Sequence, residues 1–225
     1  MEIKLLSKLS RDYVEQLLSG IPFFKLVKQQ DAWQFELLLQ SSRIVTYSGG
    51  ETVLQRGESD RWLFFLLKGR LAVYADDPLQ GELINYVTPG EVFGDLAQLM
   101  GQPRTATVIA ESNCRESIVL ATDASIFGDI SSTRPITIQT KLAYYRNTVH
   151  NLRWKLEVYR SQHLQHPLAN KHRQVKLYTG TKETLEELRA LYEQAQALAG
   201  LLLDWNREFG VLSEATALPQ DAFTI

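Results

Sequence analysis

The feature that most constrains the fold of this chain is a series of short β-prone runs between residues 41 and 123. Each run ends at turn-forming residues, and the runs occupy 43–47, 52–55, 62–67, 71–74, 83–87, 106–110 and 117–120. The turns between them contain Gly49-Gly50, Gly57, Gly69, Asp76-Asp77-Pro78, Gly81 and Pro89-Gly90. Many short strands at this spacing are typical of a closed antiparallel sheet, such as a barrel or jelly roll.

Helical patterns flank the β-rich stretch. Before it, residues 1–40 predict a helix capped by Ser10 and ended by Gly20 and Pro22, and a second helix near 31–39. After it, the pattern predicts a short helix over 123–130, a long helix that begins near Pro135, and another helix over about 182–209; residues 211–225 are weakly patterned.

We therefore expect an α+β protein with two regions. Residues 1–133 would hold the N-terminal helices and the antiparallel barrel, and residues 134–225 would hold the long helix and a C-terminal helical region.

The long helix carries the most regular apolar pattern in the chain. Its apolar residues alternate between spacings of four and three, and they are Ile138, Leu142, Tyr145, Val149, Leu152, Leu156 and Tyr159. Such a heptad seam needs a partner helix, because an apolar stripe on a lone helix would face water. The basic run 141–176 and the acidic helix 182–209 are complementary, so the two helices could also pack on each other. We predict a parallel homodimer through residues 138–159, whereas a monomer would mean that the 182–209 helix folds back over the seam.

Composition narrows the classes of function. The net charge is −2, so nothing global points to nucleic acid as a partner. No apolar run approaches the roughly 18 residues of a membrane-spanning helix, so no membrane association is expected. Cys114 is the single cysteine, which excludes an intrachain disulfide and favours a reducing, cytoplasmic location.

The sequence carries no pattern for catalysis or for metal binding. The histidines lie in a basic region without paired carboxylates or thiols, so we expect solvated side chains and no metal at His150, His163, His166 and His172. The chain has no P-loop and no nucleophile elbow. We therefore expect no catalytic residues and a protein that is not an enzyme.

The most informative segment is 90–108, with the sequence G-E-V-F-G-D-L-A-Q-L-M-G-Q-P-R-T-A-T-V. It predicts a strand, a tight turn at Gly94 that allows a ligand close to the backbone, and a helical turn over 95–100 whose free N–H groups suit an anion. The planar guanidinium of Arg104 also suits a phosphate. An acidic Asp95 beside such a site makes sense if the ligand also offers a hydroxyl, as a ribose phosphate does.

This segment resembles the phosphate-binding cassette of cyclic-nucleotide-binding domains, whose pattern is F-G-E-x-A-L-x-x-x-x-P-R-x-A-T-V. The two matching halves, with no gap between them, are Phe93-Gly94-Asp95-Leu96-Ala97 and Pro103-Arg104-Thr105-Ala106-Thr107-Val108. The surroundings are similar too, with a helical turn at Phe23-Phe24, strands over 50–58, a hairpin over 63–73 and an exit strand at 110–114. The resemblance covers roughly residues 15 to 160.

The resemblance implies a cyclic nucleotide as ligand, with cAMP favoured over cGMP, and a set of binding residues. The expected set is Phe93, Gly94, Asp95, Leu96, Ala97, Arg104, Thr105 and Ala106. Within it, Arg104 would pair with the exocyclic phosphate and Asp95 would bond the ribose 2′-hydroxyl. Backbone groups of Leu96 and Ala97 would cradle phosphate and sugar, and Thr105 would lie beside phosphate or base.

One position departs from the family pattern. The family has Glu where this chain has Asp95, whose side chain is one methylene shorter. Losing a charged hydrogen bond costs about 1.5–3 kcal/mol, or about 10- to 150-fold in affinity. Because Arg104 is retained, we expect weakened rather than abolished binding. A plain helix cap is the competing role for Asp95.

Two functions from different classes follow. The first is a regulatory sensor that couples cyclic-nucleotide binding to a C-terminal helical surface recognised by a protein partner. The second is a ligand-free, degenerate barrel that acts as a constitutive dimeric scaffold or adaptor. A transcriptional regulator is a third, disfavoured alternative, because the region after the seam helix lacks the pattern of a helix-turn-helix with a β-wing.

Overall fold

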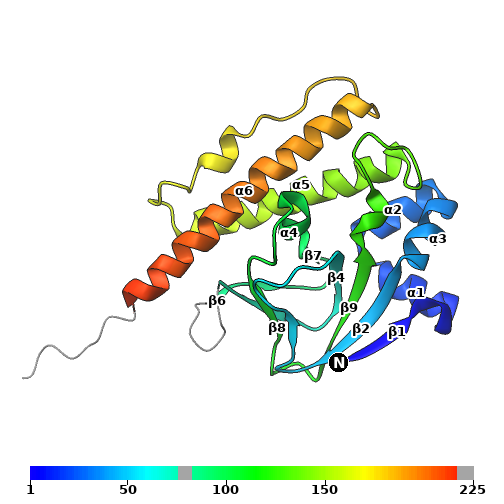
Figure 1. Ribbon diagram of the computed structural model, residues 1–225, viewed down its shortest axis with the longest axis horizontal. Helices are drawn as coiled ribbons and strands as arrows, with labels where there is room; N and C mark the ends of the chain where they lie inside the picture. The colour runs from blue at the N-terminus through cyan, green and yellow to red at the C-terminus, as the bar shows by residue number, and fades with distance from the viewer. Residues whose placement is uncertain (76–82, 217–225) are drawn as a thin grey trace, which may run out of the picture.

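Two antiparallel sheets pack face to face and form the β-rich body of the molecule (Figure 1). The computed structural model describes residues 1–75 and 83–216, so the turn predicted at Asp76-Asp77-Pro78 and Gly81 and the tail 217–225 lie outside the described residues. The first sheet contains, in spatial order, β1 Glu2–Leu5, β2 Ser42–Ser48, β9 Glu116–Asp123, β4 Trp62–Lys68 and β7 Val92–Phe93. The second contains β3 Thr52–Leu54, β8 Thr107–Ala110, β5 Leu71–Tyr74 and β6 Leu83–Val87. The predicted α+β fold with an antiparallel jelly roll is confirmed.

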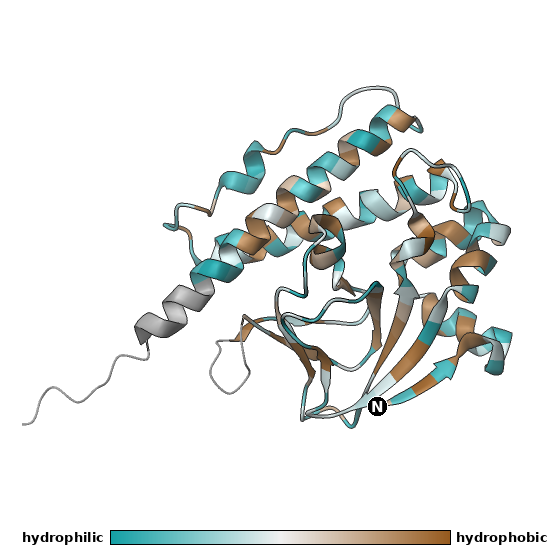
Figure 2. Cartoon of the chain, viewed as in Figure 1, coloured by the Kyte–Doolittle hydropathy of each residue, from teal (hydrophilic) through white to brown (hydrophobic). Residues whose placement is uncertain are grey.

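The first sheet is buried on both of its faces, and the sequence of β4 shows how. Phe64 and Leu66 point toward the second sheet, whereas Leu63 and Phe65 pack on the N-terminal helices. Successive side chains of a strand point to opposite faces, so a sheet that is covered on both sides needs a nearly continuous apolar run. The run W-L-F-F-L-L in β4 meets this need, and the strands of both sheets carry long brown segments in Figure 2.

Three helices cover the outer face of the first sheet: α1 Arg11–Leu18, α2 Pro22–Gln30 and α3 Ala32–Gln40. Two details of this region differ from the prediction. Helix α1 ends before Gly20 as predicted, but Pro22 also lies in the first turn of α2, a helix that the pattern did not predict, where its missing N–H is not needed. Residues 2–5 form β1 and pair with β2, and the alternating sequence E-I-K-L was the signal for a strand.

The long helices α5 Ile138–Gln162 and α6 Leu185–Thr216 lie side by side across the end of the barrel that carries α4 Asp95–Met100 (Figure 1). They run parallel, because Arg146 bonds Glu187 near the start of both helices and Tyr159 packs on Trp205 further along. The chain returns between them through residues 163–184, which include the 3-10 turn η3 Lys171–Gln174.

Two helix boundaries after the barrel differ from the prediction. The short helix expected at 123–130 is the 3-10 turn η2 Ala124–Phe127. Helix α6 continues to Thr216, so residues 211–216 are helical although their pattern is weak.

The predicted seam of α5 forms, but its partner is α6 of the same chain. The seam residues Leu142, Val149, Leu152, Leu156 and Tyr159 are buried. They share one core with α6 side chains, among them Leu188, Leu191, Ala195, Leu198, Leu202 and Trp205. The expected homodimer through residues 138–159 is therefore corrected: within the described structure the seam is covered by its own chain. The tether 163–184 favours this partner because it raises the effective concentration of α6 near α5.

A further correction concerns the histidines, which were expected to be solvated. His172 in η3 is buried, and its Nε2 lies 2.7 Å from Oε2 of Glu157.

Among the residues that the structure describes, no helix is both long and apolar enough to cross a membrane.

We predict that Leu152→Ala lowers the free energy of unfolding by about 2–5 kcal/mol, because a fully buried side chain leaves a cavity in the seam. Trp154→Ala is the matched control, since Trp154 lies two residues further along the same helix and is exposed, and we expect a change within about 0.5 kcal/mol. Urea unfolding measures both. Equal stability of the two variants would contradict the packing of α5 on α6.

Glu157 joins the end of α5 to η3 and generates a pH prediction. A hydrogen bond from Arg160 is the main cause that lowers the pKa of Glu157 from 4.5 to about 2, and hydrogen bonds from Arg173 and His172 add to it. Burial acts in the opposite direction and is outweighed. The ionised form is therefore favoured in the folded state, so the stabilisation is complete above pH 4.5 and disappears as the pH falls toward 2.

We expect Glu157→Gln to be less stable than the wild type at pH 7, by about 1 kcal/mol or less because the carboxylate is partly exposed. The difference should shrink between pH 4.5 and 2. Thermal unfolding across this range measures it, with the exposed Glu193→Gln as control. A difference that does not change with pH would refute the ion-pair explanation.

Candidate functional site

The predicted cassette forms a strand, a tight turn and a short helix at one end of the barrel. Gly94 follows β7 and occupies the N-cap position of α4 with φ +77°, a conformation that L side chains rarely adopt. A Cβ at this position would lie 2.6 Å from Nη1 of Arg104. Glycine is therefore required twice, by the backbone angle and by the guanidinium beside it. Because Gly94 is the N-cap, Asp95 is the first residue of α4 and not its cap.

Arg104 is buried and bonded on three sides. Its side chain is 2% exposed. Nε donates to Oδ2 of Asp60 at 2.9 Å, and Nη2 donates to Oδ1 of the same carboxylate. Nη1 donates to the carbonyl of Gly94 at 2.6 Å, and Nη2 donates to the carbonyl of Trp62 at 2.6 Å. A guanidinium has five N–H groups, so these four bonds leave one N–H group on Nη1.

All eight residues of the predicted binding set line one cavity, which has a volume of about 90 Å³. The cavity lies between the second sheet, the cassette and the two long helices. Apolar side chains of the barrel, such as Leu54, Val73 and Val108, form its floor. Arg104, Lys155, Asp95 and Glu91 supply the charged part of the wall, so the arrangement combines an apolar surface with cations and acids, as a nucleotide site can.

Asp95 is the polar group in this cavity that most lacks a partner. Its side chain is 2% exposed, and Oδ2 has no hydrogen-bond partner among the described residues. Oδ1 lies 4.0 Å from Nζ of Lys155, which is an ion-pair distance without a hydrogen bond. A buried, unsatisfied carboxylate oxygen is costly unless another group donates to it. The carboxylate therefore suits a ligand that brings a hydroxyl or N–H donor.

Sequence reasoning missed three kinds of residues at the cavity. Asp60 precedes β4 and holds Arg104, but its position in the turn S-D-R carried no signal for this pairing. Lys155 and Tyr159 of α5 also line the cavity. Tyr159 belongs to the seam and Lys155 lies beside it, so the sequence could have predicted that this part of the helix faces the barrel. Leu202 and Asn206 of α6 also line it, and no pattern in the sequence placed α6 there.

Lys155 and Tyr159 bring polar groups from the helix to the cassette. Nζ of Lys155 donates to the carbonyl of Val92 at 3.2 Å, so the lysine bridges α5 and β7. Burial raises the pKa of Tyr159 well above its usual range, so its hydroxyl stays neutral. The wall formed by α5 therefore contains the cation of Lys155 and the neutral side chain of Tyr159.

We predict that Gly94→Ala is more destabilising than Gly101→Ala. Both glycines flank α4 with positive φ, so both variants carry a backbone strain of about 1–2 kcal/mol. A Cβ at Gly101 meets nothing within 4 Å, whereas one at Gly94 displaces Arg104 and adds about 1.5–3 kcal/mol. Urea unfolding measures the difference. Equal losses would show that Arg104 does not depend on the glycine.

Comparisons with known proteins agree with this geometry. Residues 44–132 match the family model described as the cyclic nucleotide-binding domain. The chain is 27% identical over 100 residues to the type II regulatory subunit of cAMP-dependent protein kinase from Drosophila melanogaster, a match that covers 44% of this chain and 26% of that protein. It is 30% identical over 95 residues to a cyclic nucleotide-gated potassium channel from Mesorhizobium japonicum, covering 42% and 24%. The chain thus spans about a quarter of the length of these curated relatives.

A solved structure extends the likeness beyond the barrel. The regulatory subunit of a cAMP-independent protein kinase A from Trypanosoma brucei superposes with a TM-score of 0.50 at 19% identity, covering 68% of this chain and 51% of that one. At this identity the likeness concerns the fold. Taken with the cassette, the two sheets and the family model, it leads to one conclusion: residues 44–132 of this chain have the fold and the sequence pattern of the cyclic nucleotide-binding domain.

Proposed function

We propose that this chain is a non-catalytic regulator that binds a 3′,5′-cyclic nucleotide at the cassette cavity and transmits binding through α5 and α6 to a protein partner. The observation that carries the proposal is the convergence of the eight predicted residues on one cavity, with the unsatisfied Asp95 carboxylate beside Arg104. The relatives support the ligand class, since their names include cAMP dependence and cyclic-nucleotide gating.

The cyclic phosphate would bind at Arg104. One N–H group of Nη1 is available, and a second contact requires the carbonyl of Gly94 or the carboxylate of Asp60 to release its bond. A phosphate that attracts Arg104 therefore pulls on both the cassette turn and the segment before β4. The ribose 2′-hydroxyl would donate to Asp95, which supplies the partner that the carboxylate lacks.

Lys155 gives α5 a direct electrostatic link to the ligand. The charge of Arg104 is already balanced by Asp60, and Asp95 adds a negative charge to the cavity wall. The ammonium of Lys155 offsets that charge and makes the cavity acceptable to an anion. A ligand that changes the position of α4 must also change the position of α5, because Lys155 is bonded to β7 and paired with Asp95.

The effector surface in this proposal is the region beyond the predicted boundary at residues 133 and 134. It contains α5 and α6, whose outward faces are free of the barrel, and Trp154 on α5 is 61% exposed.

cAMP stays favoured over cGMP, and a cytoplasmic location stays a prediction. Between residues 134 and 216 the structure contains α5, η3 and α6 and no strand, an arrangement that offers no β-wing for DNA.

A ligand-free scaffold is the second candidate, and one observation favours it. The cavity volume of about 90 Å³ is well below the roughly 300 Å³ of the smallest ordinary ligand pockets. In this alternative the Arg104–Asp60 pair is a permanent structural element, and the chain presents α5 and α6 in a single state.

Titration with cAMP and cGMP, followed by thermal unfolding and calorimetry, separates the two candidates. For the sensor we expect a stabilisation of about 2.7 kcal/mol when the nucleotide is present at 100 times its dissociation constant. Arg104→Gln should abolish the response, because it removes the cation that meets the phosphate. Asp95→Glu should preserve or strengthen it, because the longer side chain reaches further toward the sugar.

Arg61→Gln is the matched control, since Arg61 lies next to Asp60 but its side chain is 68% exposed and pairs with Asp123. It should bind like the wild type. A response that survives Arg104→Gln unchanged would contradict the site, and silence of the wild type and of every variant at millimolar nucleotide would favour the scaffold.

A further inference from the structure

Helix α6 forms part of the wall of the cavity, and this feature extends the proposed function. Leu202 and Asn206 of α6 line the cavity together with Lys155 and Tyr159 of α5. Leu202 is 2% exposed and belongs to the core shared by the two helices. The part of α6 that follows Leu198 therefore packs on α5 and covers the ligand site at the same time.

The space that remains is small compared with ordinary ligand sites. The cavity holds about 90 Å³, whereas small-molecule sites hold roughly 300–1,000 Å³. A neighbouring hollow of about 260 Å³ shares Arg104, Thr105 and Asn206 with the cavity. Asn206 lines both hollows, so withdrawal of this part of α6 would enlarge the space beside Arg104.

Helix α6 also contacts α4 of the cassette. Nε2 of Gln196 donates to the carbonyl of Leu99 at the end of α4, at 3.3 Å. Leu99, with Leu96 and Met100 at the edge, packs in the same core as α5 and α6. The positions of α4 and α6 are therefore coupled through these contacts.

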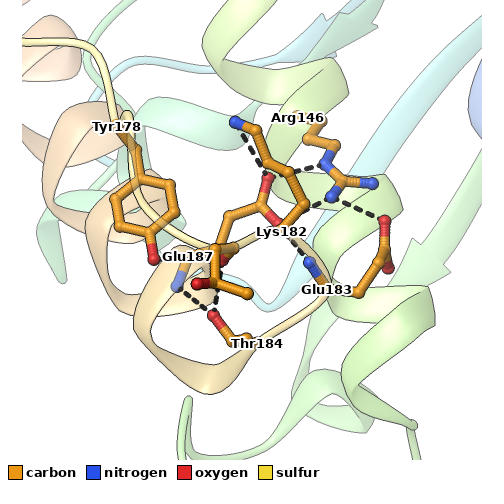
Figure 3. A network of polar contacts seen from close by, with 7 residues as sticks. Arg146, Tyr178, Lys182, Glu183, Thr184 and Glu187 are labelled. Atoms are coloured by element: carbon orange, nitrogen blue, oxygen red, sulfur yellow. Dashed lines mark hydrogen bonds and ion pairs between the residues drawn. The ribbon is translucent and has the colours of Figure 1, made fainter.

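The two ends of α6 are held differently. Figure 3 shows the network at its start, where Arg146 of α5 donates to Glu187 and Glu183. The hydroxyl of Thr184 accepts from the N–H of Glu187, and the Glu187 carboxylate accepts from the N–H of Glu183. Glu187 is 2% exposed, so this end carries a buried, paired charge that is costly to separate. The other end is held by apolar packing around Trp205. It also carries the pair of His166 and Glu208, whose side chains are 20% and 48% exposed.

We propose that the C-terminal half of α6 is an internal competitor for the outer part of the ligand site. It is displaced when a cyclic nucleotide binds, while the start of α6 stays anchored through Arg146 and Glu187. The inference rests on the proposed function, because it needs a ligand at the cassette. After displacement, Lys155 and Tyr159 remain on the wall and contact the ligand, and the apolar stripe of α5 near Leu156 becomes accessible to a partner.

The first test compares two equal truncations in the full chain. Leu202→Ala removes a side chain from the displaceable half, so it should raise the affinity for cAMP at least about tenfold by making displacement easier. Leu188→Ala is the control, since Leu188 is equally buried in the same seam but lies beside the anchored end. It should leave the affinity within about threefold of the wild type. Circular dichroism establishes that both variants fold.

The second test needs no variant. Hydrogen exchange of the wild type with saturating cAMP should become faster in residues 199–208 and stay unchanged in residues 185–192. Binding accompanied by unchanged or slower exchange in 199–208, with equal affinities for the two variants, would overturn the competitor role and leave the proposed function intact. A silent wild type with a responsive Leu202→Ala variant would support the competitor as the cause of silence. Failure of every protein to bind cAMP or cGMP would overturn the ligand function and the competitor with it.

Discussion

The buried guanidinium of Arg104 is the interaction on which the rest of the site depends. A charge taken out of water must be paired and hydrogen-bonded, and here Asp60 and the carbonyls of Gly94 and Trp62 meet that requirement. These partners come from residues 60–62, at the turn into β4, and from the cassette. One side chain therefore holds together two segments that are far apart in the sequence.

That requirement explains the conformation of the cassette. Gly94 must lack a side chain because the guanidinium lies against its Cα, and α4 begins directly behind it. The cavity then contains a satisfied cation and an unsatisfied acid, since Oδ2 of Asp95 has no partner among the described residues. The acid, rather than the arginine, is the group whose environment improves most when a ligand with a hydroxyl arrives.

Much of the fold could be predicted from the sequence, because its signals are local. Strand β4 reads as W-L-F-F-L-L, and a sheet buried on both faces requires such a run; α4 follows from Gly94 and the short amphipathic turn behind it. The binding set was found through a motif whose residues are close in sequence. Asp60, Lys155, Leu202 and Asn206 were not found, because their roles depend on contacts between distant segments. The seam at Leu152 was predicted correctly, but periodicity shows only that an apolar stripe needs a partner and does not say which helix supplies it.

The parallel arrangement of α5 and α6 has a consequence for the order of events during synthesis. The barrel, the cassette and α5 all precede the return segment 163–184, and α6 follows it. Domains can fold as they emerge from the ribosome, so a nascent chain would complete the barrel and the cassette while α6 is still being translated. In such a chain, small molecules can reach the cavity before α6 packs against it.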